Sequence, residues 1–330
     1  MNAIPAALRE DDVVAALREI LGSPANPRIT LGIGDDAALW QPSRSHRSAI
    51  TTDMLVEGVH FTRTAMTLAD AGWRALAANA SDLAAMGARP VLATVALGVS
   101  SETSFADLCE LYRGLAAAAA QTQLAIVGGD LSRAPVLTIA IAAVGEVRAA
   151  DAKTRAGARA GNVLAVTGEL GAARAGLIVA QRHGVLAPEL AEVALRAFRR
   201  PQARIGEGRF LAASRNVTAM MDCSDGLSTD LGRLCAASGL GAVVDAVPVA
   251  PAARALSRQV AEDAERFALS GGEDFELLVA VQARAFGYLA GRFEARFGRP
   301  LLEIGHLRAG SGMEFRGEPL ERSGWEHFER

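Results

Sequence analysis

The chain has 330 residues, of which 50% are hydrophobic and 22% are charged. This length exceeds that of most single cores and predicts two domains, while the hydrophobic share argues against disorder. The formal net charge of −3 offers no basic field to a nucleic-acid backbone, and no apolar run approaches the roughly 18 residues that a membrane span needs.

The cysteines and the N-terminal sequence bear on the cellular compartment. Cys109, Cys223 and Cys235 are too few and too scattered for a disulfide framework or a zinc cluster. The first residues include acids and lack the basic-then-apolar pattern of a signal peptide. We therefore expect a soluble, cytoplasmic protein with reduced thiols and with no nucleic-acid or membrane partner.

Lysine is almost absent, because Lys153 is the only one in the chain. A Walker A loop and a protein-kinase core each place a specific lysine on the nucleotide phosphates. Lys153 lies in the sequence DAKTRAG, which matches neither motif. If this chain binds ATP, other groups must therefore neutralise the phosphate charge.

The first half of the chain predicts strands that alternate with helices. Apolar runs rich in β-forming residues predict strands over Ser48–Val59, Val91–Val99 and Pro135–Val147. Between them, the helical spacing of Ala and Leu predicts helices over Leu68–Met86 and Ser104–Gln121.

The first of these helices has clear start and stop signals. Thr67 or Asp70 can cap its N-terminus, and Gly87 followed by Pro90 would end it. Its apolar residues are spaced along one side, and they are Trp73, Leu76, Ala77, Ala80, Leu83 and Ala84.

A small, polar, glycine-punctuated stretch, Arg148–Asn162, predicts a domain boundary. We assign residues 1–148 to an N-terminal domain and residues 149–330 to a C-terminal domain. The elements predicted beyond the boundary are strands at Asn162–Thr167, Val217–Met221, Val243–Val249 and Phe275–Val281, and helices at Ala172–His183 and Leu227–Ala237. The pattern is that of two α/β domains.

Aspartates recur beside glycine and inside apolar or small-residue runs. The segments are GIGDDAAL (Gly32–Leu39), ITTDMLVEGVHF (Ile50–Phe61), NASDLAAMGA (Asn79–Ala88), IVGGDLSR (Ile126–Arg133), MMDCSDGLSTD (Met220–Asp230) and SGGEDFELLV (Ser270–Val279). A buried carboxylate needs a partner, and these acids have few basic neighbours in sequence. Magnesium binds a few carboxylates together with substrate phosphates. The segments therefore predict several Mg²⁺ ions that bridge a polyphosphate.

Most of these residues also have a purely structural interpretation. Asp36 can belong to a surface turn, Asp130 to a hairpin turn, and Ser224 can be an N-cap. His60 can be an ordinary structural histidine. Asp82 is harder to explain in this way, because a helix so rich in alanine rarely carries an acid without a function.

Taken together, six motifs resemble those of the thiamine-monophosphate kinase family, in order and in spacing. They are GIGDDAAL, TTDMLVEGVHF, SDLAAMGA, GGD, DCSDGLSTDL and GGEDFEL, and the resemblance extends from about Leu31 to GWEHF (Gly324–Phe328). The family is related to the aminoimidazole-ribonucleotide synthetase-like ATP-binding enzymes. The resemblance implies their two-domain α/β (α+β) fold. In it, an N-terminal mixed sheet with helices pairs in a homodimer, and a C-terminal α/β domain completes the nucleotide and substrate site.

The resemblance also implies the activity, which is ATP-dependent phosphorylation of thiamine monophosphate to thiamine diphosphate with several Mg²⁺ ions. The acceptor phosphate has a second pKa of about 6, so it is already nucleophilic at neutral pH. Phosphoryl transfer then needs mainly positioning and charge neutralisation. We therefore expect direct in-line transfer without a covalent or general-base residue.

The resemblance assigns three sets of site residues. The implied metal ligands are Asp36, Thr51, Thr52, Asp53, Asp82, Asp130, Asp222 and Asp225. The implied ATP contacts are Tyr112, Gly129, Asp130, Arg155 and Ser224. The implied acceptor contacts are His60, Glu273 and Trp325. The chain departs from the family pattern at Ala80 and Leu131, and neither departure removes a carboxylate.

One different interpretation is a nucleotide-binding oxidoreductase, because Gly32–Ala37 satisfies GxGxxG/A and Asp53 follows at a suitable distance. Two adjacent carboxylates would then face a pyrophosphate, and Pro42 would interrupt the helix that must follow. Both points argue against a dinucleotide site.

Enzymes related to the thiamine-monophosphate kinases are closer competitors. Selenophosphate synthetase-like enzymes use an N-terminal cysteine or selenocysteine with a lysine, whereas the first cysteine here is Cys109. Aminoimidazole-ribonucleotide synthetase-like enzymes and a hydrogenase-maturation relative share the acidic and glycine features more loosely. A non-catalytic, metal-stabilised dimer would keep the carboxylates but would not turn over ATP.

Overall fold

The computed structural model describes residues 10–325. The chain divides into two compact units. Unit 1 holds the described residues up to Leu83 together with Arg89–Ala149, and unit 2 holds Ala84–Ala88 and the described residues from Ala150 onward. The last three residues of the GWEHF segment lie outside the described residues.

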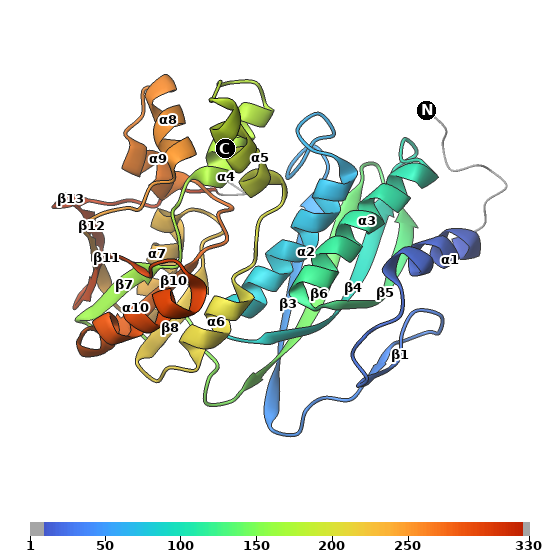
Figure 1. Ribbon diagram of the computed structural model, residues 1–330, viewed down its shortest axis with the longest axis horizontal. Coiled ribbons are helices and arrows are strands. Elements are labelled where there is room, and N and C mark those ends of the chain that lie inside the picture. Colours follow the sequence, from blue (N-terminus) through green and yellow to red (C-terminus); the bar gives the residue numbers. More distant parts are fainter. Residues whose placement is uncertain (1–9, 326–330) are drawn as a thin grey trace. The chain divides into compact units, whose positions relative to one another are not determined.

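Unit 1 is built on a mixed four-stranded sheet of order β3-β6-β4-β5. The strands β3 and β4 each pair antiparallel with β6, and β4 and β5 are parallel. The elements are α1 (Glu10–Leu21), β1 (Ile29–Leu31), β2 (Leu39–Trp40), β3 (His46–Val56), α2 (Leu68–Ala85), β4 (Arg89–Val99), α3 (Phe105–Thr122), β5 (Ala125–Arg133) and β6 (Thr138–Arg148). Helices α2 and α3 cover one face of this sheet (Figure 1).

The other face of this sheet is open. Along β3 the side chains alternate, so that Leu55 is buried under the helices while Ile50 and Met54 are 75% and 54% exposed. Thr52 lies between these two on the same face and is also exposed. A strand with two large exposed apolar side chains is unusual unless another surface covers it.

The predicted start and stop of α2 are confirmed. The Thr67 and Asp70 side chains each accept a hydrogen bond from the other residue's backbone amide, at 3.1 and 3.2 Å. This reciprocal pair satisfies two amides that the helix would otherwise leave unbonded. Gly87, with φ of +69°, follows the last helical turn.

Unit 2 contains a seven-stranded sheet of order β13-β12-β9-β11-β7-β10-β8, in which only β12 and β9 are parallel. The strands are β7 (Asn162–Val166), β8 (Val217–Asp222), β9 (Gly241–Val244), β10 (Leu277–Gln282), β11 (Leu302–Arg308), β12 (Met313–Phe315) and β13 (Glu318–Pro319). The helices are α4 (Ala172–Ala180), α5 (Pro188–Arg199), α6 (Ile205–Ala212), α7 (Leu227–Ser238), α8 (Pro251–Gln259), α9 (Ala264–Ser270) and α10 (Ala283–Phe297).

Helices pack against both faces of the central strands of unit 2. Leu164 of β7 lies in a core with residues of α4, α5, α7, α8 and α9. Ala165, the next residue, faces the opposite core with residues of α6 and α10. Successive strand residues are therefore buried on opposite sides, which explains why these strands read as continuous apolar runs.

Several predicted boundaries are wrong. The strand predicted over Val243–Val249 ends at Val244, because the amides of the next two residues, Asp245 and Ala246, both donate to the Ile304 carbonyl and the ladder pattern stops there. Strand β3 ends at Val56 rather than Val59, and α4 ends at Ala180 rather than His183. The hairpin-turn interpretation of Asp130 is also wrong, because β5 continues through Arg133.

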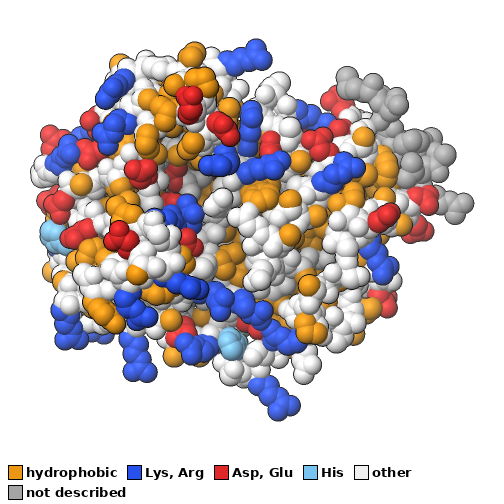
Figure 2. All heavy atoms as spheres, in the orientation of Figure 1, with side chains coloured by type: hydrophobic (Ala, Val, Ile, Leu, Met, Phe, Trp, Pro, Cys, Tyr) orange, Lys and Arg blue, Asp and Glu red, His pale blue; other side chains and the backbone are white. Residues whose placement is uncertain are grey.

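The distribution of charged side chains on the surface is consistent with the small net charge. Acidic and basic side chains both occur across the face drawn in Figure 2. No helix among residues 10–325 combines the length and the apolar character that crossing a membrane requires.

Candidate functional site

The predicted metal ligands of unit 1 form more than one group. Thr51 and Asp53 lie on the helix-covered side of β3, and the Thr51 hydroxyl donates a hydrogen bond to the Asp82 carboxylate of α2. Thr52 points to the open side, where its hydroxyl donates to the Ile141 carbonyl at 2.9 Å. Thr51 and Asp82 are therefore in contact at the edge of the sheet, and Asp53 lies on the same side of β3, two residues after Thr51.

Asp130 belongs to a different part of the same sheet. Strand pairing across the sheet aligns Asp53 with Gly129, and it aligns Met54 with Asp130. Asp130 therefore points to the same face as Met54, and Asp53 points to the opposite face. Asp130 is thus exposed on the open face, where it accepts a hydrogen bond from Ser132 at 2.8 Å. Strands β3 and β5 are the two sheet edges, three strand spacings or about 14 Å apart. Asp53 and Asp130 therefore do not bind one ion within a single sheet.

Besides Asp130, unit 1 holds two predicted ATP contacts, and these differ in accessibility. Gly129 is exposed, and a Cβ atom there would lie 1.9 Å from the Val95 carbonyl oxygen, so only glycine fits. Tyr112 is only 6% exposed within α3. Burial raises the pKa of its phenol to about 12, as expected for a packed side chain.

The GIGDDAAL segment connects two short antiparallel strands, β1 and β2, and no helix follows it. Its Asp36 is exposed, and the Asp36 amide donates to the Asp35 side chain at 2.9 Å. A dinucleotide site needs a helix N-terminus at this point, so the oxidoreductase interpretation is wrong. His60, after β3, accepts a hydrogen bond at Nδ1 from the Val56 amide at 3.1 Å.

In unit 2 the predicted ligands lie in one loop, Asp222–Gly226, between β8 and α7. Asp222 is 3% exposed at the end of β8. The backbone amides of Ser224 and Asp225 both donate to the Asp230 carboxylate, at 3.0 and 3.1 Å. These two hydrogen bonds hold the backbone of the loop in one orientation.

Two predicted acceptor contacts bond to the same loop. The Glu273 amide donates to the Ser224 carbonyl at 2.7 Å, and the Trp325 amide donates to the Asp225 carbonyl at 3.0 Å. The Trp325 side chain is 53% exposed. A Cβ atom at Gly324 would lie 1.7 Å from the Asp225 carbonyl oxygen, so glycine allows this approach. Implied nucleotide, metal and acceptor residues of unit 2 therefore meet in one place.

The segment that carries Glu273 has a strained backbone. Glu273 and Phe275 both have positive φ angles, +69° and +50°, which non-glycine residues rarely adopt. The Phe275 amide donates to the Cys223 carbonyl at 2.9 Å. Between them, Asp274 accepts hydrogen bonds from the amides of Gly171 and Ala173 at 2.6 and 3.1 Å. Such strain persists only where the surroundings enforce it, and it is concentrated at functional sites.

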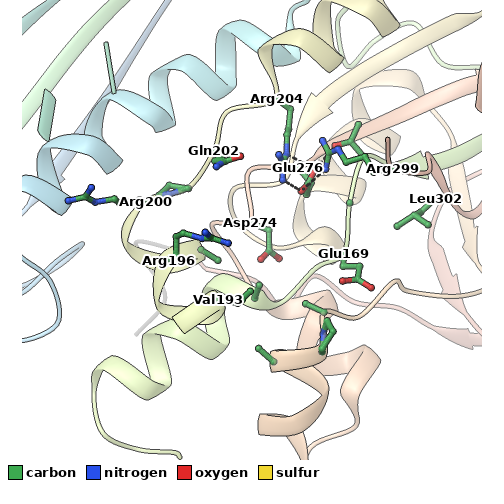
Figure 3. Close-up of a pocket in the computed structure, with 18 of the residues that line it drawn as sticks. Glu169, Val193, Arg196, Arg200, Gln202, Arg204, Asp274, Glu276, Arg299 and Leu302 are labelled. Atoms are coloured by element: carbon green, nitrogen blue, oxygen red, sulfur yellow. Dashed lines mark hydrogen bonds and ion pairs between the residues drawn. The ribbon is translucent and has the colours of Figure 1, made fainter. Parts of the chain in front are cut away.

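A cavity of about 570 Å³ lies beside this segment, within the size range of ligand pockets. Figure 3 shows Asp274 and Glu276 directed into it. Glu276 is 4% exposed and accepts two hydrogen bonds from Arg204, at 2.5 and 3.0 Å, and one from Thr167 at 2.6 Å. The buried carboxylate is therefore paired and anchors the C-terminal end of the strained segment.

The backbone at Arg155 contacts β8 and the last residue of α7. The Met220 amide of β8 donates to the Thr154 carbonyl at 3.2 Å, and the Ser238 hydroxyl donates to the Arg155 carbonyl at 2.7 Å. The Arg155 side chain is exposed. An exposed guanidinium fits contact with phosphate oxygens, which it can bind with two parallel hydrogen bonds.

The predicted metal ligands offer carboxylate and hydroxyl oxygens, which suit a hard divalent cation. Among residues 10–325, no group of three His, Cys, Asp or Glu side chains is arranged to hold a metal. Magnesium does not require such a cage, since it takes one or two carboxylates and completes its shell with water and phosphate oxygens. Asn79 Oδ1, one turn before Asp82, is a buried acceptor that has no hydrogen-bond partner in the described part of the chain.

Sequence reasoning missed Asp230 and Arg233. Asp230 is fully buried, and burial together with the Asp225 charge raises the pKa of its carboxyl to about 6. Arg233 forms an ion pair with Asp230 at 3.0 Å and a second ion pair with Asp225. The available signal was an acid in the first turn of a helix that follows directly on the predicted ligands.

The chain is similar to known proteins over nearly its full length. Residues 34–147 match the family model of the AIR synthase related protein N-terminal domain, and residues 159–315 match that of the C-terminal domain. Thiamine-monophosphate kinase of Escherichia coli K12 is 38% identical over 91% of this chain and 92% of its own.

Two solved structures are also similar. Thiamine-monophosphate kinase from Stenotrophomonas maltophilia is 34% identical, with a TM-score of 0.81, over 96% of this chain and 98% of its own. AaThiL complexed with AMPPCP and TMP is 28% identical, with a TM-score of 0.77, over 98% of this chain and 100% of its own.

Proposed function

The chain belongs to the thiamine-monophosphate kinase family of AIR synthase related proteins, and we propose that it transfers the γ-phosphoryl group of ATP to thiamine monophosphate. The products are ADP and thiamine diphosphate. A similar protein has been solved with the ATP analogue AMPPCP and with TMP, which supports both substrates. The competing proposal is another ATP-dependent reaction of the same superfamily.

One observation carries the proposal from this chain itself. The loop that holds Asp222, Ser224 and Asp225 also receives the amides of Glu273 and Trp325. A kinase must hold a nucleotide and an acceptor next to each other, because most of its rate acceleration comes from positioning. Backbone bonds between the two sets of residues meet that requirement.

Magnesium, when bound, supplies positive charge to the β- and γ-phosphate oxygens. We assign its binding to Asp36, Thr51, Thr52, Asp53, Asp82, Asp130, Asp222 and Asp225. Arg155 binds phosphate oxygens through its guanidinium, and the other nucleotide contacts are Tyr112, Gly129, Asp130 and Ser224. The ionised acceptor phosphate needs no protein base, so the transfer is direct and in line.

The acceptor contacts are His60, Glu273 and Trp325. The exposed indole of Trp325 offers a flat face to the thiazolium ring, which is a cation. Glu273 provides a carboxylate on a rigid segment, which favours hydrogen bonds of one fixed direction.

The test is ADP release from Mg-ATP with thiamine monophosphate, free thiamine and aminoimidazole precursors as acceptors. We expect turnover only with thiamine monophosphate. ADP release with an aminoimidazole precursor alone would assign the chain to another branch of the superfamily. With a chiral γ-phosphate, in-line transfer predicts inversion of configuration, and net retention would indicate a phosphoenzyme.

The metal assignment has its own test. Asp53→Asn and Asp130→Asn each remove one carboxylate charge without changing side-chain size. We expect each variant to lower kcat by at least about 10- to 100-fold, the range typical even for groups that only support metal ligands, with little change in the thermal unfolding midpoint. Turnover like that of the wild type in both variants would contradict the assignment.

We further propose a cytoplasmic homodimer that forms through the open face of the unit 1 sheet. Ile50 and Met54 expose large apolar surfaces on that face, and such surfaces commonly mark interfaces. Free cysteines at Cys109, Cys223 and Cys235 suit a reducing compartment.

A further inference from the structure

We propose that Asp230 is a positioning residue that couples the nucleotide site to the acceptor site. This inference rests on the proposed function, because it concerns the loop assigned to both substrates. Asp230 is not among the residues assigned to contact either substrate. It acts through the backbone of Asp222–Gly226.

The Asp230 carboxylate makes the contacts that hold this loop. It is fully buried and accepts two backbone amides, those of Ser224 and Asp225, on a single oxygen. Its other oxygen is paired with Arg233 at 3.0 Å. A buried carboxylate with three charge-assisted bonds is held in one orientation, and the loop amides are therefore held too.

The carbonyl groups of the same loop bond to the acceptor residues. The peptide unit between Ser224 and Asp225 directs its amide at Asp230 and its carbonyl at the Glu273 amide. The preceding peptide unit directs the Ser224 amide at Asp230 and the Cys223 carbonyl at the Phe275 amide, and the Asp225 carbonyl, one peptide further on, accepts the Trp325 amide. Two peptide units of the loop therefore join the Asp230 carboxylate to the strained segment that carries Glu273. A rotation of either peptide would displace both sites together.

Arg233 adds a second link between Asp230 and the loop. It bridges Asp230 and Asp225, so the buried carboxylate and an assigned metal ligand are tied to one guanidinium. Removal of the Asp230 charge would leave Arg233 with Asp225 alone. The direction of the Asp225 side chain therefore also depends on Asp230.

The test compares Asp230→Asn with a matched control, Asp263→Asn, in the full chain. Asp263 also accepts two backbone amides, those of Glu265 and Arg266 at 3.1 and 3.0 Å, but at the start of α9. Asp230→Asn keeps the side-chain size. Its NH₂ group must face either Arg233 or the two loop amides, which are all donors, so at least one of these hydrogen bonds is lost.

We expect Asp230→Asn to raise the KM for both ATP and thiamine monophosphate and to lower kcat/KM about 10- to 100-fold, the range seen for groups that orient ligands. Asp263→Asn should lower the thermal unfolding midpoint and leave both KM values unchanged. A residue with a merely structural role would reduce only the active fraction, and therefore kcat.

A second readout does not depend on turnover. Mg-ADP binding, followed by calorimetry and by tryptophan fluorescence, should weaken about 10-fold in Asp230→Asn and stay unchanged in Asp263→Asn. If the wild type fails to phosphorylate thiamine monophosphate, the proposed function is wrong, and Mg-ADP binding still tests Asp230. Unchanged Mg-ADP affinity, or a rise in only one of the two KM values, would overturn the coupling.

Discussion

At the scale of single residues, the backbone angle of Glu273 is the most informative observation. Glu273 has a φ of +69°. Glycine adopts this backbone conformation freely, whereas other residues adopt it at a cost of about 1 kcal/mol or more. The chain nevertheless has glutamate there, next to Gly271 and Gly272. A costly conformation that carries a charged group fits ligand binding better than it fits stability.

The strain at this position predicts the outcome of Glu273→Gly. We expect the free energy of unfolding to stay within about 1 kcal/mol of the wild type, because relief of strain offsets the flexibility of the unfolded chain. The KM for thiamine monophosphate should rise at least about 10-fold. Gln123→Gly, at another left-handed position with φ of +60°, is the control and should leave all kinetic constants unchanged.

Asp274 allows a residue-scale prediction of pH dependence. Burial raises the pKa of its carboxyl to about 7, although backbone amides of α4 favour the charged form. The folded state therefore keeps this proton between about pH 4 and pH 7, where the unfolded chain releases it. The contribution of Asp274 to stability must fall as pH rises through that window.

The measurement is the difference in thermal unfolding midpoint between the wild type and Asp274→Asn. We expect the advantage of the wild type to shrink from pH 4 to pH 7. A difference that is constant with pH, or that grows, would show that the carboxyl titrates normally in the folded protein.

At the scale of elements, Glu146 connects β6 with two other parts of unit 1. It is 3% exposed and accepts hydrogen bonds from Arg28, the Ser43 amide and Arg89 at 2.6–3.0 Å. Burial by itself would raise the pKa of Glu146, but these donors outweigh it and lower the pKa to about 2. The end of β6 is thus tied to the segment before β3 and to the start of β4.

Glu146→Gln should destabilise unit 1 by on the order of 1–3 kcal/mol at pH 7, since it removes a charged acceptor from three donors. The lowered pKa makes this contribution fully present above about pH 4.5 and lost as pH falls toward about 2. Urea unfolding at pH 7 and at pH 3 measures it, and the difference between variant and wild type should be smaller at pH 3. An equal difference at both values would mean that packing, and not the ion pairs, is responsible.

At the scale of the whole molecule, the open sheet face predicts the oligomeric state. Ile50→Glu would place a carboxylate in the proposed apolar interface, at a cost of several kcal/mol. Sedimentation velocity should then show a dimer for the wild type and a monomer for the variant. Val185→Glu changes a side chain that is 79% exposed in unit 2 and should remain dimeric. A monomeric wild type would remove the proposed interface.

Much of the fold was predictable from local patterns. The α2 helix has apolar residues at helical spacing, reciprocal caps and a terminal glycine, and each of these signals is local in sequence. The end of β9 was not predictable in this way, because Val243–Val249 is as apolar as a strand. The residues after Val244 instead donate their amides to the Ile304 carbonyl, a contact that local patterns do not encode.

The sequence by itself predicted the chemistry of the site, because carboxylates beside glycines in apolar runs favour a hard cation whatever their arrangement. Only the tertiary structure decided which of them act together. Asp53 and Asp130 lie on opposite edges of one sheet, whereas Ser224, Glu273 and Trp325, distant in sequence, are joined through peptide hydrogen bonds of one loop. The physical reason is that a side chain's type and burial follow from short-range pattern, while strand register and loop contacts follow from the packing of a whole unit.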